Sequence, residues 1–144
     1  MKHAFLAMKV LSADTPEAAG ARCIIKRTLR QMALPVGEPA EYVAWFVAHP
    51  WACTTGIERA LQQSVRAYER NDTVRENRYA NQVVVLMGAL GFRLDWPGLY
   101  PTFIYNSPKP ENLPGGRWGG GECYQLSHVW TLLEDIRKAE NQPE

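Results

Sequence analysis

The chain has little of several features that define common protein classes. Its 144 residues include three cysteines, Cys23, Cys53 and Cys123, and such an odd, widely spaced set favours reduced thiols over a disulfide framework. No stretch approaches the roughly 20 apolar residues that a membrane-spanning helix needs. Near the N-terminus, Lys9 ends an apolar run too short for a secretion signal. We therefore expect a cytoplasmic protein without a membrane anchor.

Charge of one sign is not in excess either. Sixteen Lys and Arg against fifteen Asp and Glu give a net charge of +1. This balance excludes an acidic nucleic-acid mimic and a wholly basic packaging protein. The chain also lacks internal repeats and linkers. Its length is typical of one domain and is sufficient to bury about 70% of the unfolded surface, so residues 1–144 are expected to form a single domain.

Helix signals occupy most of the chain. Thr15-Pro16-Glu17 has the composition of a helix start, and apolar residues recur at helical spacing until Pro35. A short helix is predicted from Pro39 to just before Pro50. Two further helices are predicted behind S/T-x-x-E capping boxes, and these boxes are Thr55/Glu58 and Thr73/Glu76. In the first of these, the core face is predicted to be Ile57, Leu61, Val65 and Tyr68, with Ala60 and Ser64 beside them.

Both ends of the chain are harder to interpret. Residues 4–11 favour a helix, although a strand is nearly as compatible and would make the fold α+β. The uniformly apolar residues 83–87 favour a buried helix that ends at Gly91. Beyond it, alternation and a Pro97-Gly98 turn predict a β-hairpin near residues 92–105. A long Pro/Gly-rich loop over 106–121, a last helix from Glu122 to Ala139 and a frayed tail over 140–144 complete the expectation.

The predicted fold is therefore mainly α, a single compact domain of about five to six helices that carries one β-hairpin. On the helix after Thr15, the basic residues Arg22, Lys26 and Arg30 recur every four residues, with Arg27 close by. They are expected to share the solvent face with no acid among them. Such a row can bind phosphates or an acidic protein surface, although an ordinary solvated helix face has the same pattern.

Two other segments suggest nucleic acid or nucleotide binding. The helices on either side of Asn71-Asp72 carry several arginines, and Asn77, Asn81 and Gln82 could read bases. The tight break and the long second helix favour an antiparallel αα-hairpin over a DNA-reading motif. The glycine-rich residues 115–121 lack the Gly-Lys-Ser/Thr sequence of a phosphate-binding loop.

That same loop places Arg117 and Trp118 between glycines. Arg and Trp dominate interaction hot spots, so these two side chains are candidates for contact with a partner. Trp118 folding back onto the domain is an equally good interpretation. The five Trp and six Tyr of the chain strengthen the first interpretation, because several of them lie beside Pro or Gly in expected turns, namely Trp51, Trp96, Tyr100 and Trp118.

Catalytic and metal-binding patterns are weak. Cys123 is expected in the first turn of the last helix, where the helix dipole lowers a thiol pKa. His128, five residues on, would lie about 140° around that helix and could not act as its base. A zinc set of His49, Cys53, Cys123 and His128 has unsuitable spacing. Nothing in the sequence positively supports an enzyme, a metal site or a cofactor.

The sequence thus favours a non-catalytic binding protein of inhibitor or adaptor type that covers the surface of a protein or protein–nucleic acid complex. Small inhibitors encoded by phages and other mobile elements share this size and lack of motifs, a comparison that rests on no matched residue. The predicted contact residues are Arg22, Lys26, Arg27, Arg30, Arg117 and Trp118. The alternatives are a nucleic-acid-binding regulator that uses the basic helix face and a cysteine-dependent enzyme that uses Cys123.

Overall fold

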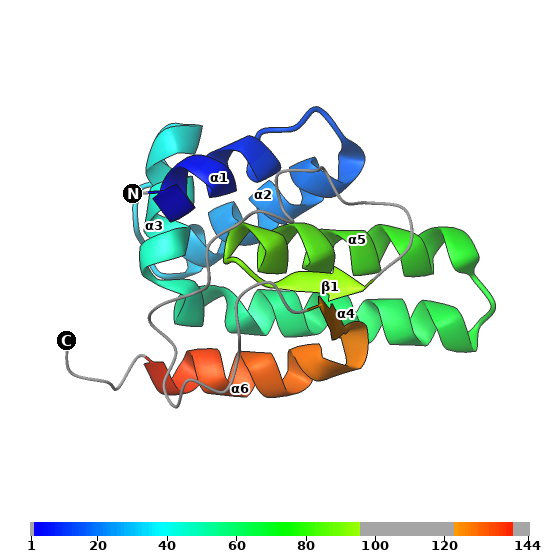
Figure 1. The fold of residues 1–144 in the computed structure, drawn as a ribbon. Helices are drawn as coiled ribbons and strands as arrows, with labels where there is room; N and C mark the ends of the chain where they lie inside the picture. The colour runs from blue at the N-terminus through cyan, green and yellow to red at the C-terminus, as the bar shows by residue number, and fades with distance from the viewer. Residues whose placement is uncertain (1, 96–122, 140–144) are drawn as a thin grey trace.

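A computed structural model describes residues 2–95 and 123–139 of the chain, and within these the fold is mainly α (Figure 1). The described helices are α1 (Lys2–Leu11), α2 (Pro16–Gln31), α3 (Pro39–Ala48), α4 (Thr54–Glu69), α5 (Thr73–Ala89) and α6 (Val129–Ala139). A 3-10 turn, Pro50–Cys53, leads directly into α4. The predicted mainly α fold class is confirmed, and the ambiguous N-terminal segment is helical.

Helix α5 is the centre of the fold. It packs against α1, α2 and α4, and α4 lies antiparallel beside it along its length (Figure 1). All residues from 83 to 90 are buried, as expected for an apolar run that forms a helix in contact with neighbours on several sides. The helix ends at Ala89 with Leu90 as its C-cap, and Gly91 follows with a φ of 98°, a left-handed conformation that favours glycine. The predicted buried helix and its terminal glycine are confirmed.

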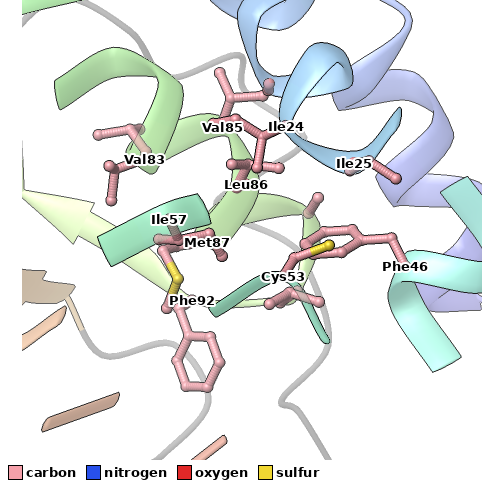
Figure 2. Close-up of a cluster of buried hydrophobic side chains, with 14 of the residues drawn as sticks. Ile24, Ile25, Phe46, Cys53, Ile57, Val83, Val85, Leu86, Met87 and Phe92 are labelled. Atoms are coloured by element: carbon pink, nitrogen blue, oxygen red, sulfur yellow. The ribbon is translucent and has the colours of Figure 1, made fainter. Parts of the chain in front are cut away.

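The hydrophobic core collects side chains from every described helix. Figure 2 shows the part around Cys53, where Ile24 of α2, Phe46 of α3, Ile57 of α4 and Met87 of α5 contribute. Phe46, Cys53, Ile57 and Met87 are fully buried. Their burial fixes how the helices pack together, and thereby the position of the candidate site described below.

The helix starts are partly as predicted. Thr15 caps α2 by accepting a hydrogen bond from the Ala18 N–H at 3.2 Å, with Pro16 in the first turn. The two predicted capping boxes are wrong. Asp72, one residue before Thr73, caps α5 by accepting from the Arg75 N–H at 3.1 Å. Helix α4 begins at Thr54 as a continuation of the 3-10 turn, so no free helix end is left at Thr55 to be capped.

The inward face of α4 also differs from the prediction. Ile57 and Leu61 are buried, but Val65 is 44% and Tyr68 is 67% exposed. Figure 1 shows that α6 lies along the first part of α4, and that α4 and α5 extend past the first turn of α6. The predicted small residues Ala60 and Ser64 are buried as expected, and Ser64 Oγ donates to the Glu76 carbonyl at 3.0 Å. Periodicity locates an apolar stripe but not the point at which its neighbour ends.

The prediction that the last helix starts at Glu122 is wrong. Residues Cys123–Gln125 form strand β2, and a 3-10 turn, Leu126–His128, separates it from α6. Strand β2 pairs in parallel with β1 (Arg93–Asp95), which places Leu94 opposite Tyr124. Both of these side chains are buried. The conformation of Cys123–Gln125 depends on pairing with a strand that is distant in sequence. Helix propensity within the segment does not indicate this pairing.

Strand β1 is thus present where the first strand of a hairpin was predicted, with a parallel partner that the sequence did not indicate. The predicted second strand at 99–105, the loop over 106–121 and the tail over 140–144 lie outside the described residues.

Candidate functional site

The candidate site begins where α2 crosses α4. At Gly56, an added Cβ would lie 2.7 Å from Cγ2 of Ile24. Such a distance is well inside van der Waals contact, so only a residue without a side chain allows the two helices to approach this closely. Nearer the start of α2, the amide end of the flexible Gln82 side chain of α5 lies beside Gly20. The close approach of α2 to α4 therefore depends on Gly56.

A groove lies over this crossing, and we call it the α2–α4 groove. It contains two neighbouring cavities of about 180 and 280 Å³, which share Ile24, Arg27, Gly56 and Arg59. The smaller one extends toward the end of α2, where Gln31 and Met32 line it. The larger one extends toward α5, and its further lining includes Gly20, Cys23, Ala60, Gln63, Tyr79 and Gln82. None of the described residues that line either cavity is acidic.

Arg27 and Arg59 approach the groove from opposite helices. Both side chains are exposed, and within the described part of the chain neither takes part in a hydrogen bond or ion pair. The carboxylate next to Arg59 in sequence is engaged elsewhere, because Glu58 accepts from Arg137 of α6 at 2.7 Å. Two unpaired guanidinium groups beside a concave surface form a site suited to anions.

The predicted basic row divides into two sides of α2. Arg22 is half-buried, and its Nη1 donates to the carbonyl oxygens of Leu11 at 2.5 Å and Ala13 at 3.2 Å. It thus ties the end of α1 to α2. Lys26 is also half-buried, with Nζ 5.5 Å from the ring centroid of Tyr42 on α3. The expectation that all four cations share one solvent face is wrong for these two, because α1 and α3 pack along that side.

The surroundings on this inner side of α2 shift the pKa of Tyr42. Its ring is buried, and burial raises the pKa of its hydroxyl, an effect that the nearby Arg22 charge partly opposes. Arg22 and Lys26 therefore interact mainly with their own protein. By contrast, Arg27 and Arg30 are exposed, and they form what we call the outer side of α2.

Exposed apolar side chains lie at the end of this outer side. Met32 is 51% and Leu34 is 39% exposed, directly after α2 ends at Gln31. Met32 also lines the smaller cavity. Arginines next to uncovered aliphatic side chains have the composition that protein–protein interfaces favour.

The cysteines show no catalytic arrangement in the described part of the chain. Cys53 is fully buried, and burial raises its thiol pKa to about 11, partly offset by a hydrogen bond with Thr28. Cys123 lies in β2 rather than in the first turn of a helix, so the argument that a helix dipole activates it is wrong. His128, which the sequence analysis excluded as a base for Cys123, accepts a hydrogen bond from the Gln125 N–H through Nδ1 at 3.0 Å. Cys23 is exposed and lines the larger cavity.

The remaining base-reading and metal-binding candidates pack against other parts of the protein. Asn81 is buried, and its Oδ1 has no hydrogen-bond partner among the described residues, so this side chain is not available to bases. The ring of His49 stacks on Trp45 and lies edge-on to Trp51, both at 5.5 Å between centroids. Among residues 2–95 and 123–139, no three His, Cys, Asp or Glu side chains are grouped so as to hold a metal ion.

Arg117 and Trp118 lie outside the described residues, so their predicted role in partner contact remains a prediction. The structure adds one residue that the sequence analysis did not connect with the basic row, namely Arg59. Its partnership with Arg27 depends on the crossing of α2 over α4, for which no local pattern exists. Within the described residues, Gly56 marks this crossing in the sequence.

Comparison of the chain with protein-family models, with curated protein sequences and with solved structures finds no match. In the part of the chain that the structure describes, no helix has the length and apolar character to cross a membrane.

Proposed function

We propose that this protein is a non-catalytic binding protein of inhibitor or adaptor type that covers an acidic surface of a partner protein. The observation that carries the proposal is the outer side of α2, where Arg27 and Arg30 are exposed beside the uncovered Met32 and Leu34. Arginine and methionine are enriched at interfaces, and arginine is prominent among hot-spot residues. Arg27 and Arg59 have no acidic partner within the described residues, so an acidic surface would supply their missing counter-charge.

The proposal predicts that Arg27→Ala combined with Arg30→Ala weakens partner binding by roughly 30-fold for each arginine that acts as a hot spot, or about 2 kcal/mol each. A matched control is Arg66→Ala combined with Arg70→Ala, which removes equal charge from the far part of α4, where both side chains are exposed. Tagged wild-type and variant proteins are used to capture partners from a nuclease-treated lysate, with detection by mass spectrometry.

A stoichiometric protein that is retained by the control pair and lost by the α2 pair is the expected result. Equal capture by both pairs would contradict the proposal, since charge on the outer side of α2 would then be irrelevant.

A nucleic-acid partner is the second candidate, and one arrangement on α4 favours it. Arg59, Arg66 and Arg70 are spaced at i, i+7 and i+11, which places them along one side of the helix, and all three are exposed. Together with Arg27 they could follow a phosphate backbone. Binding would then weaken steeply with salt, and each lost phosphate contact would reduce the slope of log K against log salt by about 1. Loss of all captured material on nuclease treatment would favour this candidate over the first.

Arg117 and Trp118 supply an independent prediction. We propose that they extend the contact surface, so changing both to Ala should abolish partner binding. The midpoint of urea unfolding should stay unchanged, because the proposed contacts are made with the partner and not with the domain. If Trp118 folds back onto the domain instead, the same double variant lowers that midpoint. Unchanged binding would remove this loop from the proposed surface.

A further inference from the structure

The α2–α4 groove has features that contact with a flat protein surface does not require. Ile24 and Gly56 line both of its cavities, and a Cβ added at Gly56 would lie 2.7 Å from Cγ2 of Ile24. Arg27 and Arg59 stand on opposite helices and line both cavities. A ligand at the junction of the two cavities would therefore lie within reach of both guanidinium groups.

The charge of the groove selects among anions. Two guanidinium groups bring a charge of +2, and the described lining residues include no carboxylate to compensate it. A carboxylate ligand would neutralise half of this charge. A phosphate monoester carries a charge of about −1.5 to −2 at pH 7, and its oxygens match the planar donors of arginine in bidentate fashion. Charge balance thus favours a phosphate monoester.

The larger cavity extends the groove toward α5 with uncharged polar groups. Gln63, Tyr79 and Gln82 line this half, and none of them is engaged in a hydrogen bond within the described residues. Amides offer both donors and acceptors, and a tyrosine offers a hydroxyl and a ring face. The volume of the larger cavity, about 280 Å³, approaches the lower end of the range for small-molecule sites.

We propose that the α2–α4 groove binds a phosphate monoester of a polar organic group, of the nucleoside monophosphate class. Arg27 and Arg59 hold the phosphate, and Gln63, Tyr79 and Gln82 contact the uncharged part. The ligand is either a free nucleotide or the phosphorylated 5′ end of a nucleic acid, since both present the same group. This site goes beyond the proposed contact with an acidic protein surface, because it needs Arg59 and the cavity but not Arg30.

Titration calorimetry of the full chain with inorganic phosphate, adenosine monophosphate and adenosine tests the proposal. Saturable binding of the two phosphate probes is expected, tightest for the nucleotide, with no binding of adenosine at the same concentrations. Arg59→Gln should weaken nucleotide binding by about tenfold or more, since it removes charge-assisted hydrogen bonds. The control Arg78→Gln, an equal charge loss at an exposed side chain of α5 outside the cavity lining, should leave the affinity unchanged.

Cys23 gives a second readout at the site itself. Its side chain is exposed and lines the larger cavity, so bound nucleotide should slow its alkylation by a thiol reagent. Site-resolved mass spectrometry follows this rate, and Arg59→Gln should abolish the protection. Absence of saturable phosphate binding, equal affinity of wild type and Arg59→Gln, or binding without protection of Cys23 would each overturn the proposal.

Two further arms identify the source of the phosphate and separate this site from the proposed function. A short single-stranded oligonucleotide with a 5′ phosphate that binds more tightly than the free nucleotide and than its unphosphorylated form identifies a nucleic-acid end. Preference for adenosine monophosphate identifies a free nucleotide. Arg30→Gln should weaken capture of the protein partner and leave nucleotide binding intact, so the two proposals fail separately.

Discussion

The two sides of α2 have similar residues but different surroundings. On the inner side, Arg22 donates to carbonyl oxygens at the end of α1, and Lys26 lies over the ring of Tyr42. On the outer side, Arg27 and Arg30 are exposed and make no contact of this kind within the described residues. Basic residues at helical spacing thus do not share one environment. The neighbours that each side meets decide whether a cation stabilises the fold or is available to a ligand.

Removal of Arg22 should give the largest change in stability. Arg22→Met keeps much of the aliphatic bulk but loses two hydrogen bonds from a charged donor to carbonyl groups of the α1–α2 connection. We expect a loss of about 2–3 kcal/mol in the free energy of unfolding, measured by urea titration at unchanged m-value. Arg30→Met on the outer side is the matched control and should change stability by no more than about 0.5 kcal/mol. Equal effects of the two variants would contradict the division into sides.

Gly56→Ala should have the next largest effect, because it forces α2 away from α4. The added methyl group would meet Cγ2 of Ile24 at 2.7 Å. Overpacking typically costs about 1–3 kcal/mol, and the better helix propensity of alanine returns about 1 kcal/mol, so we expect a net loss of about 1 kcal/mol. Ala60→Gly, on the same helix, serves as a control that lowers propensity without a clash. An unchanged or increased urea midpoint for Gly56→Ala would show that the helices do not need this close approach.

Lys26→Met should have the smallest effect of the three. It removes a cation 5.5 Å from the Tyr42 ring centroid and keeps the aliphatic stem, so a loss of about 0.5 kcal/mol is expected. Phenylalanine retains the ring face, so Lys26→Met should cost the same free energy of unfolding in a Tyr42→Phe background as in the wild type. A Lys26→Met loss as large as that of Arg22→Met would indicate an interaction other than the one with Tyr42.

The sequence predicts what depends on neighbours along the chain. The start of α2 at Thr15-Pro16, the buried run of α5 and the glycine after it are all local patterns, and the structure confirms them. The exposure of Tyr68 could not be predicted, because it depends on where α6 begins beside α4. The strand at Cys123 could not be predicted either, because its partner is Arg93 in β1.

The candidate site follows the same rule. Arg27 was identified from helical spacing, whereas its association with Arg59 arises only when Gly56 lets α2 cross α4. The inner role of Arg22 likewise depends on the return of the chain from α1. Residues that lie together on one helix can be predicted from the sequence. Residues that meet only where two helices cross cannot.

The most direct test of the account compares partner capture by the two sides of α2 under identical conditions. Nuclease-treated lysate is incubated with wild type, with the outer pair Arg27→Ala/Arg30→Ala and with the inner variant Lys26→Met, all confirmed as folded by circular dichroism. We predict that one stoichiometric protein is captured by wild type and by Lys26→Met and is lost from the outer pair. Retention of that protein by the outer pair with loss from Lys26→Met would contradict the account.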